Sequence, residues 1–186
     1  MSSHHKSDSE IQLELQQIAA AKENPARFGV LYDKYYKSIF VFIHRRTDDE
    51  ELTADITSQV FLKALMNIKK YEFKGVPFSA WLFRIAFNEI NMYFRKNNGQ
   101  RVVSLNQNGM LQIAQEVELE ENAESIKQMM NAVKQLDALE IQLIELRFFE
   151  KNSFAEVGTI VGITENNAKV KVYRILDKLK NILKKK

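Results

Sequence analysis

The sequence predicts an all-α protein of two small helical domains joined by a flexible acidic linker. Apolar residues recur at spacings of three and four through most of the chain, which is the period of an amphipathic helix. No alternating run of β-branched residues is long enough to indicate a sheet.

Charge divides the chain in the same way. Residues 1–101 hold 15 basic and 12 acidic side chains, residues 102–125 hold five Glu and no basic residue, and residues 126–186 hold 12 basic and 7 acidic. Two basic lobes around an acidic strap predict two contacts with a polyanion and a connector with a different role.

Composition narrows the class of protein. The 186 residues are enough for one large or two small domains, and 45% apolar with 27% charged residues is typical of a globular chain. The absence of cysteine excludes disulfides and thiolate metal sites and favours a reducing compartment. No signal peptide is visible, and no apolar run approaches the roughly 20 residues of a membrane helix. We therefore expect a soluble cytoplasmic protein with no membrane insertion.

The first predicted helix covers residues 26–46. Apolar side chains recur there on one face, and Asn24 with Pro25 supplies a cap and a first helical position. Three further helix starts, near residues 48, 138 and 154, are predicted by capping boxes. In each, a short polar side chain and a Glu three residues later satisfy each other's backbone donors: Thr47 with Glu50, Asp137 with Glu140, and Ser153 with Glu156.

The stretch GVPFSAWLFRIAFNEINMYFRK, residues 75–96, mixes six aromatic side chains with arginines and asparagines and holds the only Trp of the chain. On helical spacing Leu82, Ala86 and Ile90 share one face, while Trp81 and Asn88 lie on a neighbouring one. One interpretation is a core helix with a basic tail. The other is a surface that grips an aromatic and anionic ligand, and different side chains of one helix can serve each.

The C-terminal part predicts a helix-turn-helix. A helix of about seven residues from Ser153 leads into a turn at Gly162, where φ > 0 is needed, and a second helix starts at Thr164. Gly158 is placed where the two helices cross closely. The outward face of the second helix carries amides and cations, which read base edges and hold phosphates: Asn166, Asn167, Lys169, Lys171, Tyr173 and Arg174. A plain helical hairpin with a solvated basic face is the less favoured alternative.

Residues 97–125 are rich in Asn, Gln, Gly and Glu and lack aromatics, which is typical of a linker with room for a short helical piece. The predicted organisation is a domain at 1–96, a linker at 97–125 and a domain at 126–186.

Four stretches, in this order, resemble one known family. FGVLYDKYYKSIFVFIHRRT and ADITSQVFLKAL resemble regions 2.1 and 2.2 of bacterial sigma-70 RNA polymerase sigma factors, and FKGVPFSAWLFRIAFNEINMYFRK resembles regions 2.3 and 2.4. LDALEIQLIELRFFEKNSFAEVGTIVGITENNAKVKVYRIL resembles region 4. The larger members carry a further domain between these two, and the linker here is too short to hold it. The chain therefore resembles the two-domain, extracytoplasmic-function (ECF) members.

This resemblance implies partners and contact residues. RNA polymerase core would be bound at its β′ clamp helices and β flap, through Asp55, Gln59, Phe61 and Leu62 on the first domain. The promoter −10 element would meet Tyr71, Phe73, Lys74, Phe78, Arg84, Asn88, Asn91 and Arg95. The −35 element would meet the six outward residues of the second helix of the helix-turn-helix. An anti-sigma factor is a further candidate partner. The residues themselves, with no Cys and only three His, lead us to expect no metal and no cofactor.

Two points stay open within this reading. Either Tyr71 or Phe73 could be the ring that stacks on an unstacked −10 base. The acidic linker could enter a basic channel of the polymerase or could be a solvated spacer. Its carboxylates, which DNA phosphates would repel, are Glu116, Glu118, Glu120, Glu121 and Glu124.

Enzymatic functions find little support in the sequence. It contains no Gly-rich phosphate loop, no HExxH and no spaced acidic metal cluster, and the acidic run 48–51 suits the positive end of a helix dipole. The alternative function is a stand-alone helix-turn-helix transcriptional regulator with an N-terminal sensing or dimerisation domain. Such a protein should bind duplex DNA by itself and should not bind RNA polymerase.

Overall fold

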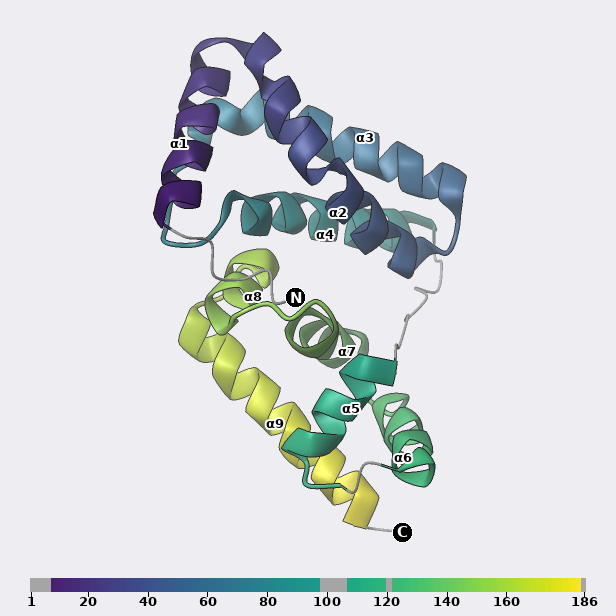
Figure 1. Cartoon of the computed structure of the whole chain (residues 1–186). Helices are drawn as coiled ribbons and strands as arrows, with labels where there is room; N and C mark the ends of the chain where they lie inside the picture. The colour runs from purple at the N-terminus through teal and green to yellow at the C-terminus, as the bar shows by residue number, and fades with distance from the viewer. Residues whose placement is uncertain (1–7, 98–106, 120–121, 185–186) are drawn as a thin grey trace. The chain divides into compact units, whose positions relative to one another are not determined.

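The computed structural model describes residues 8–97, 107–119 and 122–184, and within these ranges no strand is formed and the regular elements are helices (Figure 1). The predicted all-α fold class is confirmed. The chain divides into two compact units. The first holds α1 to α4, and the second holds α5 to α7, most of α8, and α9.

The first unit begins with a helix that was not predicted, α1 (Asp8–Glu23). The helix predicted at residues 26–46 is present, but its first turn, η1 (Pro25–Phe28), is a 3-10 turn, and α2 covers Gly29–Thr47. The Asn24 side chain accepts a hydrogen bond from the Ala26 amide at 3.0 Å, so the predicted cap is confirmed.

The predicted capping box of Thr47 with Glu50 is wrong. Thr47 is the last residue of α2, and Asp48 ends that helix in the left-handed conformation with φ 53°. The chain reverses within these two residues, so Asp49 becomes the cap of α3 (Glu50–Asn67), and its side chain accepts a hydrogen bond from the Leu52 amide.

The rest of the first unit is η2 (Ile68–Lys70), a loop at residues 71–77 that we call the α4 loop, and α4 (Phe78–Asn97). Helices α2, α3 and α4 pack pairwise, and α1 packs against α2 and both 3-10 turns. Their shared core contains Ile18, Leu31, Ile39, Phe42, Ile43, Val60, Ala64, Phe78, Leu82, Ala86 and Ile90.

The second unit consists of α5 (Gln107–Glu116), α6 (Ala123–Val133), α7 (Ala138–Ile144), the π-helical turn η3 (Glu145–Phe149), α8 (Phe154–Val161) and α9 (Glu165–Lys184). Helix α5 packs against α6 and η3, and α9 packs against α6 and α7. The capping boxes predicted before α7 and α8 are confirmed, each by two reciprocal hydrogen bonds. Helix α5 lies inside the predicted linker, and the predicted boundaries stay a prediction.

Candidate functional site

The two aromatic side chains of the α4 loop, Tyr71 and Phe73, differ in exposure, although their sequence offered no reason to choose between them as the base-stacking ring. The Tyr71 ring is buried, with its centroid 5.0 Å from the Phe78 ring and 5.2 Å from the Trp81 ring. Burial raises the pKa of Tyr71 to about 12, and the negative charge of Glu14 adds to this shift. Phe73 is 45% exposed, so in this conformation it is the loop aromatic that can offer a ring face to a ligand.

The loop is short and its exposed residues follow one another. Lys74 and Gly75 are exposed beside Phe73, and Gly75 adopts a φ of +74°, which glycine takes without steric cost. Phe78, predicted as a contact residue, is fully buried. Its ring and that of Tyr71 therefore lie beneath the loop.

One face of α4 carries the polar residues predicted to meet DNA. Arg84, Asn88 and Arg95 are exposed and Asn91 is half-buried, and their spacings of four, three and four place them on one side of the helix. Leu82, Ala86 and Ile90, which share one face on helical spacing, are on the buried side.

A pocket of about 340 Å³ lies beside this polar face, between α3 and α4. Its lining includes the half-buried Trp81 together with amide, basic and acidic side chains: Lys63, Asn67, Lys70, Ile85, Asn88 and Glu89. The Lys63 ammonium and the Glu89 carboxylate form an ion pair at 2.6 Å. Lys63, Asn67 and Lys70 were not predicted as site residues, because only the packing of α3 against α4 brings them next to Asn88.

The residues predicted to bind polymerase lie on α3. Asp55, Gln59 and Leu62 are exposed and share one face, with Leu62 50% exposed. Phe61 is buried, and its ring centroid lies 4.7 Å from that of Tyr32 and 6.5 Å from that of Phe28. Phe61 thus supports the packing of α3 on α2 beneath the exposed face.

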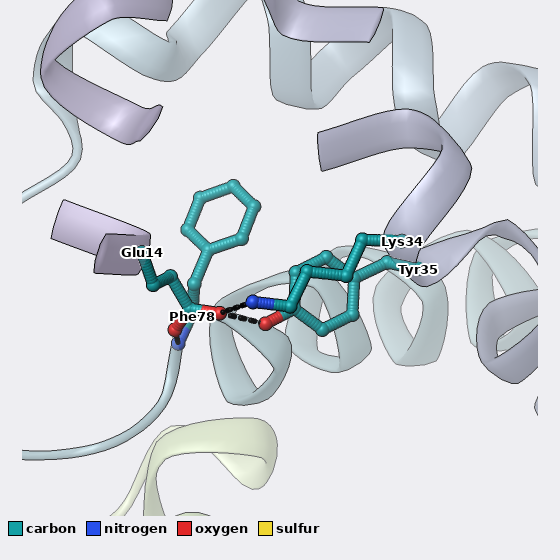
Figure 2. Close-up of polar contacts among 4 residues, drawn as sticks. All are labelled: Glu14, Lys34, Tyr35 and Phe78. Atoms are coloured by element: carbon teal, nitrogen blue, oxygen red, sulfur yellow. Dashed lines mark hydrogen bonds and ion pairs between the residues drawn. The ribbon is translucent and has the colours of Figure 1, made fainter. Parts of the chain in front are cut away.

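A buried carboxylate fastens α1 to this unit (Figure 2). Glu14 accepts hydrogen bonds from the Tyr35 hydroxyl, from the Lys34 ammonium at 2.9 Å and from the backbone N–H of Phe78 at 3.3 Å. Burial, followed by the hydrogen bond to Glu14, raises the pKa of Tyr35 above its usual range. One side chain of α1 therefore contacts both α2 and the first residue of α4.

In the second unit, α9 has one exposed polar face and one buried apolar face. Of the six residues predicted to contact the −35 element, Lys171 is half-buried and the other five are exposed: Asn166, Asn167, Lys169, Tyr173 and Arg174. The opposite row, Ala168, Val172, Leu176 and Leu179, is buried. The Thr164 hydroxyl caps the helix by accepting a hydrogen bond from the backbone N–H of Asn167 at 3.2 Å.

Two glycines set how α8 meets α9. A Cβ on Gly158 would lie 2.8 Å from the carbonyl oxygen of Ile163, which confirms the predicted close approach. Gly162 has a φ of +86°, which confirms the predicted left-handed turn.

Two lysines beyond the predicted reading residues are paired with acids of the same unit. Lys178 contacts Glu140 at 2.6 Å, and Lys180 contacts Glu118 of the predicted acidic strap at 3.5 Å. Both pairs are exposed to solvent and therefore contribute little to stability. Glu120 and Glu121 of the strap, and Lys185 and Lys186 at the C-terminus, lie outside the described residues.

Neither a metal centre nor a membrane span is apparent in the described part of the chain. No group of three or more His, Asp or Glu side chains there is placed to hold a metal ion. None of its helices combines the length and apolarity needed to cross a bilayer.

Comparison with known proteins gives two family matches. Residues 31–100 match Sigma-70 region 2, and residues 132–181 match Sigma-70, region 4. The ECF RNA polymerase sigma factor BldN of Streptomyces coelicolor is 31% identical over 182 residues, which cover 95% of this chain and 67% of BldN. The ECF RNA polymerase sigma factor SigM of Bacillus subtilis is 25% identical over 156 residues, or 81% of this chain and 91% of SigM.

Solved structures share the fold. CnrH, in complex with the cytosolic domain of CnrY, aligns with a TM-score of 0.57 at 18% identity over 92% of this chain and 97% of the CnrH chain. The sigma factor RpoE of Bartonella quintana, in complex with the anti-sigma factor NepR, aligns with a TM-score of 0.52 at 19% identity over 84% and 96% of the two chains.

Proposed function

This chain belongs to the sigma-70 family of RNA polymerase sigma factors, in its extracytoplasmic-function group, and from that premise we propose how its two units divide promoter recognition. The family directs promoter-specific transcription initiation, and the chain does so as a DNA-binding initiation factor. The observation that carries the proposal is the order of the two matches. They cover α2 to α4 and α7 to α9, the helices with the exposed amide and cation faces.

In the first unit, the α4 loop and α4 bind the −10 element. Phe73 stacks on one unstacked base, Lys74, Arg84 and Arg95 hold phosphates, and Asn88 and Asn91 supply hydrogen bonds to base edges. Stacking on an aromatic ring is worth about 1–3 kcal/mol per base, which is comparable with the few kcal/mol that unstacking costs. One captured base with its phosphate contacts can therefore nucleate strand opening without ATP. Tyr71 and Phe78 act from below, as the packing that shapes the loop.

In the second unit, α9 reads duplex DNA at the −35 element. Asn166 and Asn167 suit adenine edges, whereas Lys169, Lys171 and Arg174 suit guanine edges or phosphates, and Tyr173 adds a phosphate contact. The exposure of this row, opposite a fully buried row, supports the assignment.

Polymerase core is bound mainly by the first unit. Asp55, Gln59 and Leu62 face the β′ clamp helices with Phe61 packed behind them, and the second unit meets the β flap. The acidic strap, with Glu116, Glu118 and Glu124, enters a basic channel of the polymerase in preference to DNA, since phosphates would repel it. The boundaries at residues 96 and 126 belong to this proposal.

An anti-sigma factor is a further proposed partner. The structures that share this fold include complexes of CnrH with CnrY and of RpoE with NepR. The exposed apolar side chains of α3, Leu62 and the 72% exposed Met66, offer a surface for which such a protein could compete with polymerase. The site of action is the cytoplasm, and the chain has no catalytic role of its own.

A stand-alone regulator is not favoured as the function, because the N-terminal unit matches Sigma-70 region 2 over residues 31–100. The deciding experiment is co-purification with core polymerase, followed by transcription from a promoter that core alone does not use. Asp55→Lys should abolish holoenzyme formation and leave helical content and melting unchanged. Glu23→Lys, the same charge reversal on an exposed position of α1, should bind normally. If Asp55→Lys retained full binding, the α3 face would not be the polymerase contact.

A further inference from the structure

The α4 loop is held at both of its ends by the same helix, α1. At the start of the loop, the Lys22 ammonium donates a hydrogen bond to the carbonyl oxygen of Tyr71 at 2.6 Å. At its end, the Glu14 carboxylate accepts a hydrogen bond from the backbone N–H of Phe78 at 3.3 Å (Figure 2). Both contacts are made to the backbone of the loop ends, so they fix where the chain runs and are independent of which side chains stand there.

The geometry of α1 allows one helix to make both contacts. Residues 14 and 22 are eight positions apart, which places them on one face of a helix about 12 Å from each other. Ile18 and Ala21 lie between them on the buried side and anchor α1 to the body of the unit. Because α1 is rigid and anchored, the two polar contacts hold the ends of the α4 loop at a constant distance from each other.

The polar chemistry of these contacts is more specific than helix packing requires. A buried carboxylate is unfavourable unless several donors satisfy it, and Glu14 receives three, from Tyr35, Lys34 and Phe78. Two of these donors, Tyr35 and Lys34, lie on α2, so their bonds hold α1 against that helix. What the carboxylate adds is a directional, charge-assisted bond to the first N–H of α4, where the helix dipole also favours a negative charge.

We infer that α1 holds the α4 loop in one conformation before DNA binds. Glu14 and Lys22 are the positioning residues, and the conformation that they hold presents Phe73 in a fixed place. This inference rests on the proposed role of the loop in capturing a −10 base. Because the loop ends are already ordered in the folded protein, less conformational entropy is lost when the base binds. Glu14 and Lys22 do not themselves contact DNA.

The first test is hydrogen exchange of the free protein in Lys22→Met and Glu14→Gln, with Glu23→Gln as the matched control on an exposed position of α1. The backbone amides of Tyr71 and Phe78, which are hydrogen-bonded at the two ends of the loop, should exchange at least tenfold faster in both variants, while α2 and α3 keep their rates and the control changes nothing. Unchanged loop rates would overturn the inference, as would equal acceleration of the whole first unit. If Glu14→Gln does not fold, Lys22→Met decides the question alone, since Lys22 is only partly buried.

The second test is open-complex formation by reconstituted holoenzyme on a duplex promoter. Lys22→Met should slow opening about tenfold with core binding unchanged, and Phe73→Ala should slow it as well. In the Phe73→Ala background, Lys22→Met should not slow opening further, because the ring that α1 positions is gone. An equal tenfold loss in that background would overturn the inference. A wild-type protein that formed no open complex would instead refute the proposed function, and the exchange result would still decide whether α1 orders the loop.

Discussion

Helices α4 and α9 are both 20 residues long and both carry predicted DNA contacts, yet they are built differently. Helix α9 has a buried row and an exposed row, and five of its six predicted contacts are exposed. On α4 and its loop the predicted contacts alternate with core residues. Asn88 is exposed next to the buried Phe87, and Phe78 is buried a few residues after the exposed Phe73.

This difference separates two ways of carrying a binding surface. On α9 most of the residues proposed to read DNA are exposed, so they can change with little effect on the core; the exceptions are the half-buried Lys171 and Tyr173, whose ring centroid lies 6.1 Å from that of Phe154. On α4 the same helix turn serves the fold and the contact, so a substitution there affects stability and recognition together. Sequence preference can therefore diverge readily at α9, while the α4 region stays tied to its packing.

The largest expected effect is the loss of stability on truncating Phe78, the buried first residue of α4. Phe78→Ala should lower the free energy of unfolding of the first unit by about 3–5 kcal/mol, the usual loss for a buried Phe truncated to Ala. Urea denaturation followed by the fluorescence of Trp81, the only Trp of the chain, measures this directly. Phe73→Ala is the matched control and should change stability by no more than about 0.5 kcal/mol. Equal losses would mean that the loop aromatic is part of the core.

A second prediction concerns the close approach of α8 to the turn that precedes α9. Gly158→Ala should cost roughly 1–3 kcal/mol, since the new Cβ would lie 2.8 Å from the Ile163 carbonyl oxygen and the backbone there cannot yield easily. Gly29→Ala is the control, because its Cβ would meet nothing within 4 Å. That change should be neutral or stabilising by a few tenths of a kcal/mol, about what a compatible Gly→Ala gains. Urea unfolding followed by circular dichroism tests both, and no loss for Gly158→Ala would show that α8 and α9 can separate without cost.

Base reading by α9 gives a third prediction. Asn167→Ala should cost roughly 1–3 kcal/mol of promoter affinity and relax preference at one base pair of the −35 element. Lys184→Met should weaken binding to all sequences alike and flatten the salt dependence. The measurement is holoenzyme binding across a panel of single −35 substitutions. If Asn167→Ala lowered affinity uniformly over the panel, α9 would be an electrostatic clamp and specificity would reside in the α4 loop.

The smallest effect under ordinary conditions is a pH dependence of the first unit. Burial beside Glu14 raises the pKa of Tyr71 to about 12, so the folded state prefers the protonated phenol more strongly than the unfolded chain, whose tyrosine pKa is near 10. The resulting stability is fully present below pH 10 and is lost as the pH rises through about 12. Urea midpoints measured across this window should fall. Glu14→Gln should lower the Tyr71 pKa, seen by tyrosinate absorbance, and a pKa that did not move would remove Glu14 as a cause.

The two helices also differ in how much of them the sequence could predict. The face of α9, the turn at Gly162 and the close approach at Gly158 follow from local periodicity and backbone requirements, so they were predictable. Two of three capping boxes were correct. The third, at Thr47, failed because a left-handed Asp48 ended α2 and moved the cap to Asp49.

The burial of Tyr71 was not predictable from its own segment, since it depends on rings of α4 and on Glu14 of α1. Helix α1 itself left a signal that could have been used. Ile11, Leu15 and Ile18 have helical spacing, and Glu14 stands next to this apolar row. Nothing in the sequence, however, indicates that Glu14 meets a backbone amide 64 residues further along the chain.

Helix α1 has a practical consequence for anyone who would work with a minimal fragment. The Sigma-70 region 2 match begins at residue 31, downstream of α1. A fragment cut at that boundary would retain α2 to α4 and their aromatic core, yet its Tyr71 carbonyl and Phe78 amide would lose the Lys22 and Glu14 side chains that bond them. The segment that matches the Sigma-70 region 2 model is here shorter than the segment that holds the α4 loop in place. Fragments for binding studies should therefore start before residue 8.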